Sequence, residues 1–394
     1  TTGFTAVSGV GYFVNTTAGA ITVTLPLSPA AGAVVAVSDY AGTADTNNIT
    51  IGRNGSNING AAADLTVSFE NSAVTLVYVD GTQGWKATDT SNLNDIALQP
   101  TYITATGGTI TCSGDYRIHT FTGPGTFCVS VTGNATGGPS NVDYMVVAGG
   151  AGAGGGEGTG GGGAGGFREG YNPGSYTASP LATTALPVSV QGYTIAVGGG
   201  GAGNSSSAQG ANGVNSTFST ITSTGGGGSG GGGGSLPPFG NGNPGGSGGG
   251  GGGRGNCSTK TGGTGNTPPV SPPQGQTGGN STCSDAAPNV DSGGGGGGAT
   301  VAGTNGTASS TGGSGGNGAT TSISASPTAY AGGGAGGSEL GSVGAAGIGG
   351  GGTPFGTPGT VNSGGGGAGT SAGPITTGGN GGSGIVIIRY KFQN

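Results

Sequence analysis

Hydrophobic and polar residues alternate along the first 90 residues of the chain. The alternation is clearest at residues 21–25 and 74–79, and turn pairs such as Asn54-Gly55 and Asp80-Gly81 separate the runs. Short alternating runs bounded by such turns predict a β-sandwich or barrel-like module over residues 1–90, and no stretch has a helical period. Trp85, the only tryptophan, is expected to close the core of this module; a platform for carbohydrate is the alternative. Further strands are expected at residues 12–14, 34–37, 49–51 and 65–69.

Residues 91–106 read as a connector between this module and the rest of the chain. Residues 92–99 are compatible with one or two helical turns that end at Pro100. Leu93, Ile96 and Leu98 have no obvious apolar partner in the chain. We therefore expect them to pack on symmetry mates in a trimeric fibre.

A second β segment is expected over residues 107–148, with strands at 109–112, 116–121, 126–131 and 142–147. The apolar run at 385–392 predicts one more strand near the C-terminus. The runs at 142–147 and 385–392 lie at the two ends of the region between them. We expect them to pair with each other and to bring the two ends of the intervening region together.

Glycine dominates the region between those two runs: 87 of the 106 glycines lie in residues 149–394, so composition places a domain boundary near Gly149. Unbroken glycine at 231–234 and 293–298 excludes collagen, which needs glycine at every third position. A flexible linker is the usual interpretation of such composition. The repetition of similar glycine runs favours an ordered lattice of left-handed polyglycine II helices, with three residues per turn and hydrogen bonds to neighbouring segments. The expected fold is therefore mainly β, with essentially no α-helix: a sandwich or barrel-like module, then a polyglycine II lattice (149–394) bracketed by strands.

Loops at the ends of a rigid scaffold are the usual location of binding residues, and tyrosine is a frequent contact residue in such loops. The connections between the glycine runs carry several aromatic residues. An alternative is that these rings plug the ends of the lattice. The receptor-binding candidates are Phe167, Tyr171, Tyr176, Phe239, Tyr330 and Phe355.

Charge and cysteine content narrow the possible partners. The chain carries 8 basic and 14 acidic residues, a net charge of −6, which argues against nucleic acid because phosphate binding needs clustered Lys and Arg. No apolar run approaches the length of a membrane span. The cysteines form no CxxC pair, which argues against zinc. Disulfides between sequence neighbours and unpaired thiols are both open for Cys112, Cys128, Cys257 and Cys283.

Catalytic patterns are weak throughout. His119 is the only histidine and has no evident nucleophile or acid beside it in the sequence. The acids of the glycine region are too few for calcium-binding repeats. Asp285 and Asp291, with Lys260, make the best paired-carboxylate candidate for a glycosidase, and it is a poor one. We expect no enzymatic activity, no cofactor and no metal.

Three stretches resemble the glycine-rich domain of bacteriophage tail fibres: residues 115–127 (DYRIHTFTGPGTF), 142–150 (VDYMVVAGG) and 384–390 (GIVIIRY). The resemblance covers residues 107–394, and residues 1–90 are similar to a β module that precedes such domains. It implies an extracellular virion adhesin that binds a bacterial polysaccharide or outer-membrane protein, assembles with other tail proteins as a homotrimer, and has no catalytic residues. The cysteines at 112 and 128 and the long loop between Cys257 and Cys283 depart from the simplest family pattern.

Two other classes of function remain open. The chain is compatible with a purely structural glycine-rich extracellular filament, and less well with a tailspike-type polysaccharide hydrolase. It has no initiating methionine and no segment typical of an attachment domain. We therefore expect it to be part of a longer product that has a virion-anchoring region.

Overall fold

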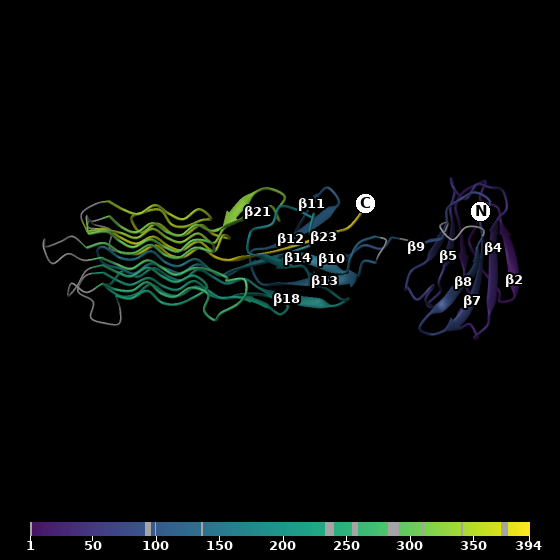
Figure 1. Ribbon diagram of the computed structural model, residues 1–394, viewed down its shortest axis with the longest axis horizontal. Coiled ribbons are helices and arrows are strands. Elements are labelled where there is room, and N and C mark those ends of the chain that lie inside the picture. The colour runs from purple at the N-terminus through teal and green to yellow at the C-terminus, as the bar shows by residue number, and fades with distance from the viewer. Residues whose placement is uncertain are drawn as a thin grey trace. The chain divides into compact units, whose positions relative to one another are not determined.

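The computed structural model divides into two compact units, each of which contains residues distant in sequence (Figure 1). The first unit comprises Thr1–Tyr102 and Gly133–Pro139, and the second comprises Ile103–Thr132 and Ser140–Asn394. The described residues form strands and no helix, as the sequence predicts, so none of them belongs to a helix long and apolar enough to cross a membrane. The residues described are 2–90, 96–98, 100–134, 137–232, 240–253, 259–282, 291–308, 311–339, 342–371 and 377–394.

The first unit is a sandwich of two β-sheets, which confirms the expected all-β module. Alternate residues of both sheets point into a shared core that includes Val23, Ile51, Val37 and Leu76. One sheet has the order β1 (Phe4–Thr5), β3 (Ile21–Thr24), β5 (Ile49–Gly52), β6 (Leu65–Val67), β9 (Ile96–Leu98). The other has the order β2 (Val10–Val14), β4 (Val34–Asp39), β7 (Ala73–Asp80), β8 (Gly84–Thr90).

Trp85 closes the core of this sandwich, as expected. Its side chain is fully buried, and its ring meets the edge of Tyr78 with 5.6 Å between centroids. The alternative interpretation of Trp85 as a carbohydrate platform is wrong, because a ring without exposed surface cannot contact a ligand.

The expected helical turns in the connector are wrong where the structure describes it. Ile96–Leu98 is strand β9, which pairs antiparallel with β6 through Leu65 and Leu98. Ile96 and Leu98 alternate with Ala97, a pattern that continues a sheet as readily as it fills a helical face. The backbone of this segment therefore pairs within the chain. Its apolar residues are no longer evidence for packing against other copies in a trimer. Leu93 lies outside the described residues.

The second unit contains a further pair of sheets and a hairpin. Sheet C has the order β10 (Thr104–Thr106), β13 (Gly125–Val131), β18 (Gly192–Ala196), β19 (Ser216–Phe218), β20 (Ile221–Ser223). Sheet D has the order β11 (Thr109–Ser113), β12 (Tyr116–Phe121), β23 (Ile385–Lys391), β14 (Asn141–Val147), β15 (Phe167–Tyr171), β16 (Ala182–Thr184), and β17 (Leu186–Pro187) also pairs with β14. Strands β21 (Ala319–Thr321) and β22 (Thr328–Tyr330) form the hairpin.

Strands β14 and β23 bracket the glycine region and pair antiparallel, which confirms the prediction that they meet. Val147 lies opposite Ile385, and Tyr144 lies opposite Ile388. The glycine region therefore begins and ends at adjacent points of sheet D. The change of composition at Gly149 does not separate two units, because the β segment before it and the glycine runs after it share the second unit.

Sheet D is buried on both faces at its centre. One face packs on sheet C through Val146, Val386 and Phe127, and the other packs through Met145 and Ile387 on residues at the ends of glycine runs. All residues of β14 except Asn141, and all of β23 except Lys391, are buried. Burial on both faces explains why both strands are continuous apolar runs rather than alternating ones.

Candidate functional site at the ends of the glycine lattice

The glycine runs form a lattice of extended segments whose hydrogen bonds join different segments. Segment 159–166 shows the pattern, because its successive amides donate to three different neighbours in turn and return to the same neighbour after three residues. Gly161 N–H donates to the Gly294 carbonyl (3.0 Å), Gly162 to Gly367 (2.8 Å), Gly163 to Gly227 (3.0 Å), and Ala164 returns to Gly297 (3.0 Å). A three-residue repeat without internal hydrogen bonds is the geometry expected of polyglycine II.

Three more segments donate amides to the carbonyls of segment 159–166. They are 148–151, 247–253 and 334–337, represented by Ala151 to Gly163, Gly250 to Gly161 and Gly334 to Gly162. One extended segment thus has six hydrogen-bonded neighbours. Ordering glycine is costly, so a net gain near 1 kcal/mol per hydrogen bond stabilises such a lattice only when pairing is dense.

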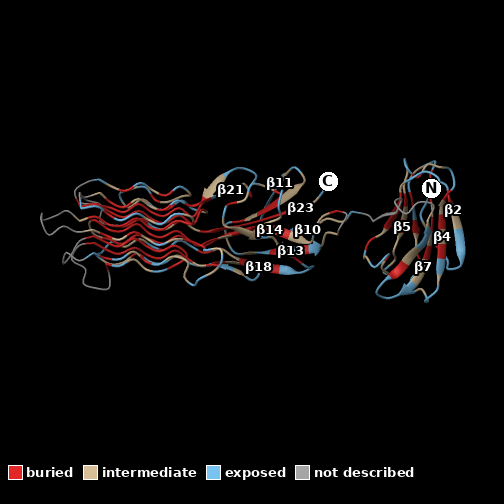
Figure 2. Ribbon diagram, viewed as in Figure 1, coloured by how far each residue is buried: buried red, intermediate tan, exposed pale blue. Residues whose placement is uncertain are grey.

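Close packing of the segments leaves no room for side chains. A Cβ atom placed on Gly162 or Gly163 would lie closer than 3.0 Å to the carbonyl oxygen of Ala151 or Ser247. The inner segments are buried along their length (Figure 2). Glycine is therefore required here for close approach of backbones, and not for chain flexibility.

Asparagine side chains replace missing neighbours at the edge of the lattice, a role that the sequence analysis missed. Each side-chain oxygen accepts a hydrogen bond from the backbone amide of a glycine in one of the runs. The pairs are Gly228 N–H to Asn212 Oδ1 (2.8 Å), Gly225 to Asn215 (2.9 Å), Gly262 to Asn280 (2.9 Å) and Gly203 to Asn380 (2.8 Å). The three-residue spacing of Asn212 and Asn215 is the signal that was available.

The two ends of the lattice differ chemically. At one end, which we call the apolar end, the segments finish in apolar residues that belong to sheet D or pack against it; these are Phe167 and Ile385 in the sheet, and Ala299, Ala319 and Ala331 against it. This end is therefore covered within its own unit.

At the other end, which we call the hydroxyl end, several of the described segments finish in Ser or Thr. The Thr159 and Thr370 hydroxyls lie 3.1 Å apart, and Thr370 Oγ1 also donates to the Gly156 carbonyl. Ser292 pairs with Ser338, and the Ser371 hydroxyl accepts the Ser338 amide (3.2 Å). These hydroxyls form hydrogen bonds with backbone groups at the ends of the glycine runs. Chain reversals such as Gly156–Gly158 lie beyond them.

Four of the six aromatic candidates lie at the apolar end. Phe167 and Tyr330 are buried in the core against sheet D, so their interpretation as receptor contacts is wrong and the competing one, that they plug the lattice, holds. Tyr171 and Tyr176 are half-buried and meet edge to face at 5.9 Å. Phe239 lies outside the described residues.

Phe355 is the candidate that lies at the hydroxyl end and is exposed. The adjacent Gly356 N–H donates to Gly369 (3.0 Å), the residue before Thr370. The Phe355 side chain is 51 % exposed, and its backbone has φ 69°, the left-handed region that bulky residues avoid. Among the residues the structure describes, it is the one aromatic in this conformation.

Buried charged groups fasten loops to sheet D near the apolar end. Both Glu169 oxygens accept hydrogen bonds: one from the Tyr176 hydroxyl (2.9 Å) and from Thr321, the other from the Ser179 amide (2.9 Å). These bonds join β15 to the loop that follows it and to the β21–β22 hairpin. This role of Glu169 was not predicted from the sequence.

Asp143 lies on β14 opposite Arg389, and both side chains are buried. Asp143 Oδ1 accepts the amide (2.6 Å) and the side-chain nitrogen (3.0 Å) of Asn172. Burial raises the pKa of Asp143 to about 6, although the bonds from Asn172 act in the opposite direction. The Arg389 guanidinium lies 4.4 Å from the ring centroid of Tyr116 and donates to the Ser175 carbonyl (3.0 Å). The two residues hold the loop that contains Asn172 and Ser175 on the sheet.

The described part of the chain contains two members of the proposed paired-carboxylate group, Asp291 and Lys260. Lys260 is buried, and the Asp291 carbonyl accepts the Glu339 amide (2.9 Å) at the hydroxyl end. Asp285 lies outside the described residues. Across the ranges that the structure describes, no three His, Cys, Asp or Glu side chains gather as metal ligands.

Cys112 and Cys128 are unpaired and exposed. They lie on β11 and β13, strands of sheets D and C, so the disulfide between these sequence neighbours is not formed. Cys257 and Cys283 lie outside the described residues, and their pairing stays open.

A protein-family model described as a glycine-rich domain matches residues 120–391. A search of curated proteins finds no match. The family match begins within β12 and ends with β23, so it includes the lattice together with the strands of sheet D that bracket it. On this evidence the chain belongs to the glycine-rich domain family.

Proposed function

We propose that this chain is a bacteriophage tail-fibre adhesin that attaches to the host cell surface through the hydroxyl end of its lattice. A binding site needs a rigid support and an uncovered surface. The apolar end packs on sheet D, whereas the hydroxyl end carries chain reversals on a hydrogen-bonded scaffold.

Phe355 is the single observation that carries this proposal. Backbone strain persists where the surrounding structure imposes it, and it is concentrated at functional sites. Here the strain holds an aromatic ring half in solvent at the hydroxyl end. Aromatic side chains supply much of the binding energy at interfaces, because they offer a large contact area at a low entropic cost.

The partners that follow are a bacterial surface polysaccharide or outer-membrane protein and the other tail proteins of the virion. Three copies of the chain would form the fibre, and its location would be extracellular, on the virion tail. With a net charge of −6 the chain is poorly suited to nucleic acid. The resemblance to phage fibres and the family membership support this proposal, and the site requires no cofactor.

The test is binding of the fluorescently labelled chain to a panel of bacterial strains, measured by flow cytometry. The informative variant is Phe355→Asn, because asparagine tolerates a positive φ and removes the ring without disturbing the turn. Its matched control is Val190→Ser, an exposed aliphatic residue (61 %) in the turn between β17 and β18. We expect Phe355→Asn to weaken binding at least about tenfold, and Val190→Ser to leave it unchanged.

Two results would overturn the proposal. If no strain in a broad panel binds the wild-type chain, the adhesin function fails and a structural filament becomes the better interpretation. If Val190→Ser reduces binding as much as Phe355→Asn, the hydroxyl end is not the site. Melting temperatures of both variants show whether either loss comes from unfolding.

A further inference from the structure

The outer face of the sheet β2-β4-β7-β8 in the first unit is uncovered within that unit. Side chains alternate across a strand, so Val35, Val37 and Leu76 enter the core while their neighbours point outward. We call the outward side the Phe13 face. It consists of Gly11 and Phe13 on β2, Val34, Ala36 and Ser38 on β4, and Ala73, Thr75, Val77 and Val79 on β7.

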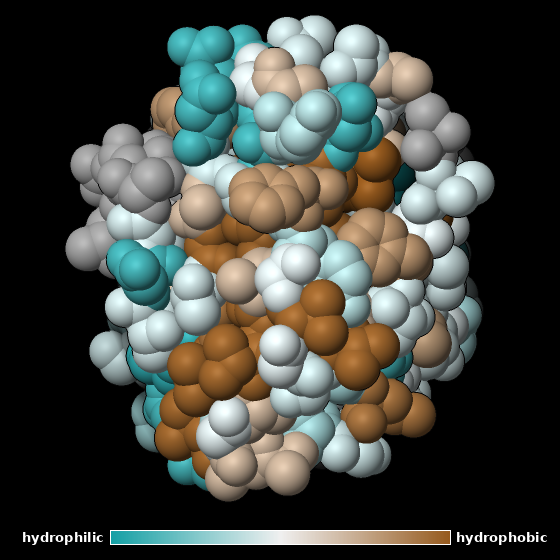
Figure 3. All heavy atoms as spheres, turned by 90° about the vertical axis from the view of Figure 1, so that its right-hand side faces the viewer, coloured by the Kyte–Doolittle hydropathy of each residue, from teal (hydrophilic) through white to brown (hydrophobic). Residues whose placement is uncertain are grey.

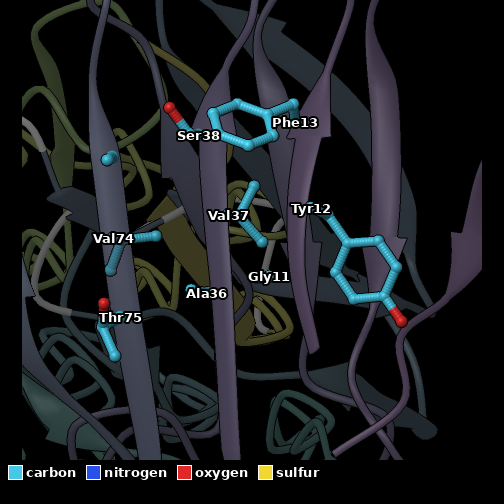
Figure 4. A pocket seen from close by; sticks show the side chains of 9 residues that line it. Gly11, Tyr12, Phe13, Ala36, Val37, Ser38, Val74 and Thr75 are labelled. Atoms are coloured by element: carbon cyan, nitrogen blue, oxygen red, sulfur yellow. The ribbon is translucent and has the colours of Figure 1, made fainter. Parts of the chain in front are cut away.

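A hollow lies beside the exposed ring on this face. Small residues line it, including Gly11, Ala36, Ala73 and Thr75, and Phe13 stands next to them with 79 % of its side chain exposed. Figure 4 shows the Phe13 ring on the side of Ser38, with the Tyr12 ring turned away. A Cβ atom on Gly11 would lie 3.7 Å from the Ala36 Cβ, an ordinary contact, so the hollow has room for an added side chain.

The Phe13 face carries no charged residue. Lys86 and Asp89 of β8 border it, opposite Val77 and Thr75, and contribute one charge of each sign. The chain as a whole has a net charge of −6, so a face without charge avoids the like-charge repulsion between two copies. Figure 3 shows the right-hand side of Figure 1, where β2 lies, and hydrophobic residues gather across the middle of that view.

We infer that the Phe13 face docks against the same face of another copy of this chain. A projecting ring and a hollow that lie side by side make a surface complementary to itself, as symmetric association requires. Two such faces can pack as the sheets of a sandwich do, about 10 Å apart, with each Phe13 ring entering the hollow of the other copy. This reciprocal contact joins two copies, whereas the fibre proposed above has three, so it is a separate contact and does not depend on that proposal.

The experiment measures self-association of the full chain by sedimentation velocity over a wide range of concentrations, with reductant present because Cys112 and Cys128 are exposed. Phe13→Ser removes the ring, and Gly11→Val fills the hollow. Leu27→Ser is the matched control, because Leu27 is 71 % exposed in the same unit but lies outside the Phe13 face. We expect both face variants to weaken association at least about tenfold and the control to associate as the wild type does.

A wild-type chain that stays monomeric at every concentration overturns the inference and assigns the Phe13 face to a different kind of partner. Association that survives Phe13→Ser and Gly11→Val unchanged also overturns it. Circular dichroism confirms that each variant is folded. No bacterial cells are used, so a negative result here is distinguishable from failure of the host-binding proposal.

Discussion

The imidazole ring of His119 stacks on the phenol ring of Tyr390, 271 residues later, with 5.4 Å between ring centroids and 29° between planes. His119 Nδ1 lies 2.7 Å from the Gly107 carbonyl, and Nε2 lies 3.0 Å from the Tyr390 hydroxyl. A carbonyl can only accept, so Nδ1 carries the proton and the neutral ring accepts the tyrosine hydroxyl through Nε2. The pair joins β12 to β23, the last strand of the chain.

This arrangement predicts a loss of stability in acid. Burial lowers the pKa of His119, so below its ordinary value, about 6.5, the unfolded chain binds a proton that the native ring resists. The free energy of unfolding contributed by this group therefore falls as the pH drops through that range. His119→Gln should remove this pH dependence while costing about 2 kcal/mol in lost packing. Thermal unfolding between pH 5 and 8 measures both; an unchanged acid slope in the variant would refute the assignment.

Asp143 should change the free energy of unfolding with pH in the opposite direction to His119. Its native pKa of about 6 lies above the ordinary 3.8, so between these values the native state holds a proton that the unfolded state releases. Stability contributed by this group is present at low pH and is lost as the pH rises through that interval. Asp143→Asn keeps an oxygen for Asn172, and we expect it to raise the free energy of unfolding by roughly 1–3 kcal/mol at neutral pH and to change it little at pH 4. Destabilisation at neutral pH would contradict this.

The lattice predicts sharply different costs for two glycine-to-alanine changes. Gly162 has six neighbouring segments around it, and a methyl group there would overlap a carbonyl oxygen, so Gly162→Ala should cost about 3 kcal/mol or more. Gly199 also lies in a glycine run, but a Cβ there meets nothing within 4 Å. We expect Gly199→Ala to be neutral or slightly stabilising. Denaturant unfolding compares them, and equal effects would show that close packing does not set the requirement for glycine.

The asparagine edge predicts a local effect. Asn212→Ala removes the acceptor of the Gly228 amide and should cost about 1 kcal/mol. Asn212→Asp keeps an acceptor oxygen and serves as the control. Hydrogen exchange should accelerate at Gly228 in the alanine variant and stay slow in the aspartate variant. Equal exchange in both would mean that water replaces the side chain without loss.

The sequence predicts best the elements that are marked by an apolar run or by dense glycine. The apolar runs that became β14 and β23 lie at the two ends of the glycine region, so their pairing could be predicted. The missing Cβ of glycine likewise leads to a lattice through sterics alone. Strand β9 was harder, because Ile96 and Leu98 fit a short strand or a helical turn equally well until β6 is placed beside them.

The candidate site was less accessible to sequence reasoning. Phe167 and Phe355 both lie close to glycine runs. The residues around them in the sequence do not distinguish the buried ring of Phe167 from the exposed ring of Phe355. What ends a run carries part of the signal, because apolar residues such as Ala299 end runs at the apolar end, whereas serine and threonine end runs at both ends, as Ser363 and Thr370 show. Asp143 carried a signal of its own, since an acid inside an apolar strand buried on both faces must be paired or have a shifted pKa.

The position of β23 in the middle of sheet D has a consequence for biosynthesis. A chain still on the ribosome lacks the strand that β12 and β14 both require until β23 has emerged, so the sheet cannot close before that point. More than two hundred residues of glycine-rich nascent chain must wait for that moment, whereas most domains fold as units during translation. Products that terminate before β23 would therefore lack the closed sheet, which makes synthesis through residue 391 a condition for a folded lattice.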